Sequence, residues 1–291
     1  MVEVIGPDDP DRAVERAAAA LERGQLVAFP TETVYGLGAD ASSATAVARI
    51  FEAKGRPTGH PLIVHIGQDD DGGCPLLDRF GRDVGPAARS LAAAFWPGPL
   101  TLIVGRGPEV VSEATGGRDT VGLRVPDHPL TLALLRRFGR GIAGPSANRF
   151  GSVSPTTAAH VVDDLGPAVD VVLDGGPCRV GLESTIVDTT GPQPVLLRPG
   201  GISTVEIEAV LGHSLLDDRG GPARASGMLV SHYAPAVPVE LVEADQVEAA
   251  LEREIAAGRM VGLVAPFVAT GAAGPSWHLP ADATGYGARL Y

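Results

Sequence analysis

The stretch Pro30–Ile66, which reads PTETVYGLGADASSATAVARIFEAKGRPTGHPLIVHI, contains two polar turns around which we expect the chain to be organised. The first turn is rich in threonine and glycine, and the second brings together a lysine, an arginine and two histidines. A helix pattern at Ala44–Ala53, preceded by serine as its N-cap, separates the two turns. Strand patterns at Gln25–Phe29 and Pro61–Ile66 flank them. This order predicts an α/β sheet with its binding site in loops at strand ends.

Outward from this stretch, helix and strand patterns continue to alternate. Further helices are predicted at 12–23, 86–95, 130–138, 155–164 and 203–211, and further strands at 101–105, 120–125, 170–174, 184–188 and 194–198. Residues 212–237 are rich in Gly, Pro, Ser and Arg, as a linker is. A strand at 239–242, a helix at 246–257 and a strand at 260–266 follow. We therefore predict a large α/β domain at 1–211, an interdomain linker at 212–237, and a small, incomplete C-terminal α/β (Rossmann-like) domain at 238–291.

The composition restricts the class of protein. A hydrophobic content of 44% in 291 residues is enough for a large core, whereas a net charge of −12 and 4% aromatic residues argue against a broad nucleic-acid surface. Cys74 and Cys178 are too far apart for a thiolate zinc motif or a disulfide framework. No signal peptide or apolar run of membrane-spanning length is apparent, so we expect a cytoplasmic protein.

Lys54 is the only lysine among the 23 lysines and arginines of the chain. Its neighbours Gly55, Arg56 and Pro57 place it in a tight turn. An ammonium group is a compact charge that suits an anionic oxygen in such a turn, whereas arginine offers a planar fork. A single lysine must stand somewhere by chance, but these neighbours favour a role in anion binding.

Polar side chains gather at the predicted strand ends and in the turns that follow them. They are Thr31, Thr33, Lys54, Arg56, His60, His65, Thr120, Arg124, Ser146, Asn148, Ser154, Ser184 and Arg198. Many hydroxyls, several cations and few carboxylates predict a pocket for a polyanion. The sequence lacks a P-loop, a dinucleotide-binding glycine motif, a GxSxG nucleophile and an HExxH zinc motif. Side chains must therefore carry much of any triphosphate binding.

Three of these residues also have simpler interpretations. His65, at the end of an apolar strand, fits a histidine of the core. Arg198 fits a cation at a strand end. Ser154, followed by Pro155, fits a helix N-cap with proline at the first helical position, although a hydroxyl at a helix N-terminus can also serve an anion.

Seven segments together make the sequence similar to the L-threonylcarbamoyladenylate synthase (YrdC-like) family in its long form. They are PTETVYGLGADA (30–41), KGRPTGHPLIVHI (54–66), FWPGPLT (95–101), VGLRVPDHP (121–129), GPSANRFGSVSPT (144–156), GLESTIVD (181–188) and VLLRPGGIS (195–203). They contain the family's K-x-R pair, Lys54 and Arg56, and its S-x-N pair, Ser146 and Asn148. SHYAP (231–235) resembles the long form's interdomain segment. The resemblance implies an open, twisted mixed sheet with flanking helices.

The resemblance also implies an activity. The family makes threonylcarbamoyl-AMP from L-threonine, bicarbonate and ATP and releases pyrophosphate. Its product supplies a separate threonylcarbamoyl-transferase complex, which modifies the adenosine next to certain tRNA anticodons, so tRNA would be an indirect target. ATP would enter as a substrate with Mg²⁺, without a protein metal site or a tightly bound cofactor. The simplest mechanism is proximity: the amine of threonine captures CO2 or bicarbonate, and the carbamate attacks the α-phosphate in line.

By the same resemblance, the site residues divide between the two substrates. The ATP contacts would be Lys54, Arg56, His60, Thr120, Ser146, Asn148, Ser154, Arg198 and Tyr233, with Lys54 and Arg56 also catalytic because they offset charge on the departing pyrophosphate. The L-threonine contacts would be Thr33, His65, Arg124, Gly144 and Ser184, with Arg124 able to bind the carboxylate bidentately. Gly144 stands where the family often has alanine. Tyr233 belongs to a hydrophobic linker segment that we expect to close over ATP.

Two other classes remain open. A non-catalytic RNA-binding module of the same fold is disfavoured by the acidic charge and the scarcity of aromatic residues. A carbamoyl-transfer domain of the hydrogenase-maturation type would bring acylphosphatase and cysteine-rich zinc segments, which two distant cysteines cannot supply.

Overall fold

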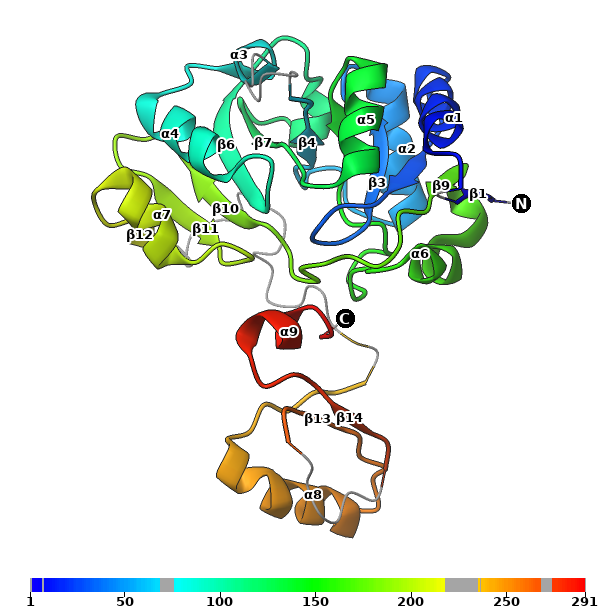
Figure 1. Ribbon diagram of the computed structural model, residues 1–291, viewed down its shortest axis with the longest axis vertical. Helices are drawn as coiled ribbons and strands as arrows, with labels where there is room; N and C mark the ends of the chain where they lie inside the picture. Colours follow the sequence, from blue (N-terminus) through cyan, green and yellow to red (C-terminus); the bar gives the residue numbers. More distant parts are fainter. Residues whose placement is uncertain are drawn as a thin grey trace. The chain divides into compact units, whose positions relative to one another are not determined.

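The computed structural model describes residues 2–6, 8–68, 76–217, 235, 237–267 and 274–290, and the chain divides into two compact units, Met1–Ala234 and Pro235–Tyr291 (Figure 1). Within the described part of the first unit, the strands form one mixed sheet in the order β1-β9-β2-β3-β8-β4-β7-β6-β10-β11-β12, with β5 also paired to β6. The strands are β1 (Glu3–Ile5), β2 (Val27–Phe29), β3 (Gly36–Asp40), β4 (Ile63–His65), β5 (Gly81–Arg82), β6 (Leu100–Arg106), β7 (Thr120–Arg124), β8 (Ile142–Ala143), β9 (Val171–Leu173), β10 (Thr185–Asp188), β11 (Val195–Arg198) and β12 (Leu216–Asp217). The predicted mixed α/β sheet is confirmed.

Several helices of this unit begin or end at capping residues of the sequence. They are α1 (Pro10–Glu22), α2 (Ala44–Lys54), α3 (Leu76–Phe80), α4 (Pro86–Phe95), α5 (Pro129–Phe138), α6 (Ala158–Leu165) and α7 (Thr204–Leu211), with 3-10 turns η1 (Ser112–Thr115) and η2 (Gly166–Ala168). The Ser43 hydroxyl accepts from the N–H of Ala46 to cap α2, and Gly55 ends this helix in the left-handed conformation at φ 62°.

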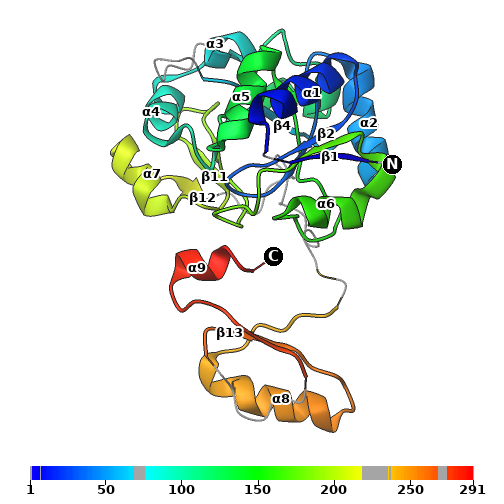
Figure 2. The same cartoon turned by 45° about the vertical axis from the view of Figure 1, so that its right-hand side comes forward.

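Alternation along β2, the third strand in the sheet order, divides the core between the two faces of the sheet. Val27 and Phe29 are completely buried in a cluster with the apolar sides of α1 and α5. Ala28 belongs to the larger cluster, which includes residues of α2, α4 and α6. Figures 1 and 2 both show α4 and α7 side by side at the other end of the sheet. Helices therefore cover both faces.

The strand directions bring polar strand ends to one edge of the sheet. β4 and β7 are parallel, and their last residues, His65 and Arg124, lie directly opposite each other. β6 and β10 run the other way, so their first residues lie at this edge. β11 is antiparallel to β10 and ends there with Arg198. This edge holds much of the candidate site.

The expected helix N-cap at Ser154 is wrong. The helix begins at Ala158, and Thr157 caps it by accepting from the N–H of His160. The carbonyls of Pro155 and Thr156 instead accept from the N–H groups of Tyr35 and Cys178, so this segment is tied to other parts of the chain and does not form a helical turn.

The second unit contains η3 (Ala244–Gln246), α8 (Val247–Ala256), β13 (Leu263–Ala265), β14 (Ser276–His278) and α9 (Ala283–Gly287). β13 and β14 pair in parallel. The predicted strand at 239–242 is wrong: these residues lie in no strand, and Leu241 is 97% exposed. In the ranges that the structure describes, no helix has the length and apolar character needed to cross a membrane.

Candidate functional site

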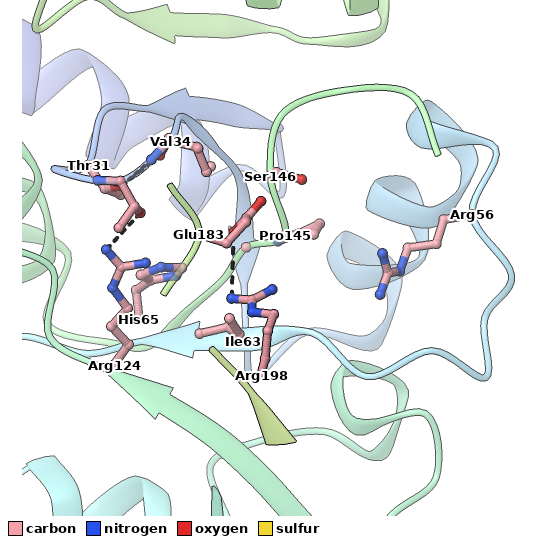
Figure 3. Close-up of a pocket in the computed structure, with 13 residues that line it drawn as sticks. Thr31, Val34, Arg56, Ile63, His65, Arg124, Pro145, Ser146, Glu183 and Arg198 are labelled. Carbon is pink, nitrogen blue, oxygen red and sulfur yellow. Dashed lines mark hydrogen bonds and ion pairs between the residues drawn. The ribbon is translucent and has the colours of Figure 1, made fainter. Parts of the chain in front are cut away.

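A pocket of the first unit is lined by turns and strand ends that are far apart in sequence (Figure 3). Its lining residues are Thr31, Thr33, Val34, Gly36, Arg56, Ile63, His65, Arg124, Gly144, Pro145, Ser146, Glu183 and Arg198. From the predicted site, the pocket thus brings together Thr33, Arg56, His65, Arg124, Gly144, Ser146 and Arg198. Three guanidinium groups in one pocket make it suitable for an anionic ligand.

Arg124 is held rigidly at the end of β7. Its side chain is 3% exposed, and its Nη2 group donates to Thr33 Oγ1 at 2.9 Å and pairs with Glu32 Oε1 at 2.8 Å. Its Nε group donates to the Gly98 carbonyl at 3.3 Å. Nε and Nη2 are therefore engaged. Nη1 forms no hydrogen bond with the residues that the structure describes and is left for a ligand. The bidentate grip expected from the sequence would require Nη2 or Nε to release its partner.

His65 lies opposite Arg124 on β4 and contacts the edge of the Phe29 ring, with the ring centroids 5.1 Å apart. Burial, together with the charge of Arg124, lowers the pKa of His65 to about 3, so the imidazole is neutral at physiological pH. Its Nδ1 atom is buried without a hydrogen-bond partner in the described ranges. The neighbouring Gly144 has little space, because a Cβ there would lie 3.0 Å from the Phe29 ring.

Arg198 and Ser184 meet where β11 ends and β10 begins. The Nε group of Arg198 donates to the Ser184 carbonyl at 3.0 Å, and its Nη2 group donates to the Ser184 hydroxyl at 2.9 Å. Ser184 is completely buried and also hydrogen-bonds the Thr101 hydroxyl at 2.8 Å. Ser184 thus holds Arg198, although it does not itself line the pocket.

Lys54 lies behind the pocket wall rather than in its lining. It is 3% exposed, and its Nζ group donates to the backbone carbonyls of Ser146, at 2.5 Å, and Asn148. Burial, reinforced by the charge of Arg56, lowers the pKa of Lys54 to about 7. The K-x-R and S-x-N pairs therefore meet in space. Asn148 Oδ1 is buried without a hydrogen-bond partner among the described residues, which leaves an acceptor for a ligand.

Arg56 and His60 flank the ring of Phe150. The Arg56 guanidinium lies 5.6 Å from the ring centroid, and the His60 ring meets it edge-on at 5.5 Å. The pKa of His60 is lowered first by burial and then by Arg56 and Arg118. His60 does not line the pocket.

Two further predicted contacts lie elsewhere. Thr120 is the first residue of β7, on the same face as Arg124 but outside the pocket lining. Tyr233 lies outside the described residues, as does nearly all of the linker segment expected to close over ATP.

The sequence interpretation missed two carboxylates. Glu32 is 1% exposed, pairs with Arg124, and accepts the backbone N–H of Asp127 at 3.0 Å. Glu183 lines the pocket and accepts the Ser154 hydroxyl at 2.6 Å, which gives Ser154 a partner other than a helix. Glu32 and Glu183 stand within motifs quoted above, PTET and GLEST. They were not selected because the sequence was searched for cations that bind an anion, and a carboxylate does not fit that criterion.

Comparisons with known proteins identify the family of the chain. The Sua5/YciO/YrdC family model, described as telomere recombination, matches residues 19–200, and the model described as threonylcarbamoyl-AMP synthase, C-terminal domain, matches residues 202–291. The threonylcarbamoyl-AMP synthase of Bacillus subtilis (strain 168) is 44% identical over 264 residues, which are 87% of this chain and 74% of that protein. The enzyme of the same name from Pyrococcus abyssi is 44% identical over 259 residues, which are 85% of this chain and 75% of that protein.

A solved structure is similar along the whole chain. The crystal structure of P. abyssi Sua5 complexed with L-threonine has a TM-score of 0.92 and 38% sequence identity, over 100% of this chain and 87% of that one. The family assignment rests on two family models, which together span residues 19–291, and on two relatives with the same name. The chain belongs to the Sua5/YrdC family of threonylcarbamoyl-AMP synthases.

Proposed function

We propose that this chain condenses L-threonine, bicarbonate and ATP to threonylcarbamoyl-AMP and pyrophosphate in the pocket between β4, β7 and β11. The observation that carries the proposal is the convergence of Arg56, Arg124 and Arg198 on one pocket that also contains the neutral His65. Such a pocket suits two anionic groups, the carboxylate of an amino acid and a polyphosphate, and holds together the two substrates that carry them. The relative bound to L-threonine supports the amino-acid half of this assignment.

The residue roles follow from the positions of the charges. Arg124 and Thr33 hydrogen-bond each other at 2.9 Å beside His65 and form the proposed threonine end, with the Nη1 group of Arg124 directed to the carboxylate. Arg56 and Arg198 form the proposed phosphate end, where they offset charge on the departing pyrophosphate. Lys54 fixes the turn at Ser146 and gains its proton as the triphosphate approaches.

The remaining predicted ATP contacts, His60, Thr120, Asn148, Ser154 and Tyr233, stay proposals, as does the role of Gly144 and Ser184 at the threonine end. Mg²⁺ would enter bound to ATP as part of the substrate. The product would supply a separate transferase complex that modifies tRNA.

The test is formation of threonylcarbamoyl-AMP and pyrophosphate by the purified chain with Mg²⁺, ATP and bicarbonate, with and without L-threonine. We expect threonine-dependent release that falls roughly 10²–10³-fold in Arg56→Ala, the usual effect of losing one group that stabilises the transition state. Arg82→Ala is the matched control, because Arg82 is 59% exposed and pairs with its neighbour Asp83.

Pyrophosphate release that does not depend on threonine contradicts the proposal, as does full activity of Arg56→Ala. RNA binding with a steep salt dependence would then favour the non-catalytic module. Turnover of carbamoyl phosphate would favour the carbamoyl-transfer class.

A further inference from the structure

Glu183 is the one carboxylate among the described residues that line the pocket. It precedes β10 and is 13% exposed, in contrast to the 1% exposure of Glu32. Its Oε1 atom accepts the Ser154 hydroxyl at 2.6 Å, and its Oε2 atom lies 3.6 Å from Arg198 Nη2, beyond hydrogen-bond length. One carboxylate oxygen is thus fixed by a hydrogen bond, whereas the other is held only by a long ion pair with Arg198 and can also receive an ammonium group.

The backbone of Glu183 is fixed as well. The Gly201 N–H donates to its carbonyl at 3.2 Å. A Cβ at Gly200 would lie 2.3 Å from the same carbonyl oxygen, so glycine there allows the chain after β11 to pack directly against Glu183. A carboxylate with both its backbone and one oxygen anchored is preorganised.

Glu183 lies between the proposed threonine end and the proposed phosphate end of the pocket. In the view of Figure 3 it stands between His65 and Arg124 on one side and Arg56 on the other. The amino group of threonine must occupy such a middle position, because its carboxylate binds at one end and its nitrogen must come near the α-phosphate through the carbamate. A bound ammonium also needs a negative charge nearby, and the other lining groups are cationic or neutral.

Other proton acceptors near the pocket fit this role less well. Glu32 does not line the pocket, and its carboxylate pairs with Arg124 at 2.8 Å. His65 is neutral and cannot offset the charge of an ammonium. Lys54 lies outside the pocket lining, with its Nζ group on two backbone carbonyls.

We infer that Glu183 binds the α-ammonium group of L-threonine and accepts a proton from it as the carbamate forms; this rests on the proposed synthase function. The ammonium loses two protons as the N–C bond to bicarbonate forms and the C–OH bond breaks. One proton leaves with the hydroxide as water, and Glu183 accepts the other and releases it to solvent. The carbamate oxygen then bonds to the α-phosphorus, and pyrophosphate departs when the bond between the α-phosphorus and its bridging oxygen breaks.

The decisive variant is Glu183→Gln, which keeps the shape of the side chain and can still accept from Ser154. We expect kcat/KM for L-threonine to fall about 10²–10⁴-fold at neutral pH, the usual range for a general base, with no loss of ATP affinity. In the variant, kcat/KM should rise about tenfold per pH unit toward alkaline pH, because free amine then replaces the missing base. Wild type should show a flatter profile, and Glu183→Asp should recover part of the loss.

Other titratable or charged groups act on Glu183 and must be considered in that profile. Arg198 lies beside it, and Lys54 and Cys178 interact with it electrostatically. Cys178 does not titrate in the relevant range, because burial raises its pKa to about 12. Glu183 raises the pKa of Lys54, so Glu183→Gln should lower that pKa further from its wild-type value of about 7; the rise in the variant is therefore measured on the alkaline side of pH 7, where Lys54 is largely neutral in both proteins.

Glu52→Gln on the exposed side of α2 is the matched control and should leave both constants unchanged. The inference is overturned if Glu183→Gln retains wild-type kcat/KM for threonine, or if it weakens ATP binding with the threonine constants and the pH profile unaltered. Failure of the proposed function looks different, because wild type itself would then form no threonylcarbamoyl-AMP.

Discussion

The buried pair between Glu32 and Arg124 allows a quantitative test of how the site is held together. The two side chains are 1% and 3% exposed, and the Nη2 and Oε1 atoms are 2.8 Å apart. Glu32→Gln removes the charge but keeps the shape, and arginine cannot lose its own proton to compensate. Breaking such a buried pair leaves an uncompensated charge, so we expect the free energy of unfolding to fall by about 3–5 kcal/mol.

Urea unfolding of the first unit is the appropriate assay. Trp96 is buried in the larger core cluster of this unit, whereas Trp277, the second tryptophan of the chain, belongs to the other unit. Measurements in a Trp277→Phe background therefore report the first unit alone. Glu3→Gln is the matched control, because its pair with Arg16 has a similar length of 2.7 Å but side chains 43% and 48% exposed.

The control should cost at most about 1 kcal/mol, because solvent screens an exposed pair. Equal losses in the two variants, or a loss below about 1 kcal/mol for Glu32→Gln, would refute the reasoning that burial makes this ion pair decisive. A large loss restricted to Glu32→Gln supports it.

Four further outcomes follow from three residues. Because the pKa of Lys54 is lowered to about 7 and a triphosphate favours its charged form, calorimetry in buffers of different ionisation enthalpy should show proton uptake on ATP binding, with affinity falling as pH rises above about 7. Between about pH 7 and the ordinary lysine pKa of 10.5, Lys54 is therefore protonated in the unfolded chain but neutral in the folded protein. The contribution of Lys54 to stability should then increase with pH across that window, and a urea midpoint that does not change with pH would contradict this expectation. Gly200→Ala should destabilise the fold by about 1–3 kcal/mol in urea, whereas Gly191→Ala, whose Cβ would lie 3.7 Å from its nearest neighbour, should be nearly neutral. Ser203→Ala removes a capping box from α7 and should cost about 0.5–2 kcal/mol, measurable as a lowered urea midpoint.

The helices were predictable because their limits are set locally. A serine N-cap was predicted for α2, and Ser43 provides it; Gly55, which no prediction assigned to this role, ends the helix. A cap depends on a few neighbouring residues, so no tertiary knowledge is needed. Ser154 shows the limit of this approach. The Ser-Pro pattern predicts the start of a helix, but the backbone that follows Ser154 hydrogen-bonds to distant segments of the chain.

The cations of the site were predictable for a different reason. Arg124 and Arg198 each end a strand pattern, and an arginine at the end of an apolar strand is a visible departure from it. The order of strands in the sheet was not visible, because strands β4, β7 and β11 become neighbours of one site only through pairings between distant parts of the chain.

The carboxylates could not be assigned from the sequence, because their roles depend on which charge each one meets. Glu32 and Glu183 both stand beside threonine or serine in a turn, and nothing local separates them. The fold places Glu32 under Arg124, where it occupies Nη2 and leaves Nη1 for a substrate carboxylate. It places Glu183 in the pocket lining with one oxygen tied to Ser154. Glu32 thus orients the cation Arg124, whereas Glu183 faces the proposed amine. Because of these two carboxylates, a pocket of three arginines can hold a zwitterion as well as a polyphosphate.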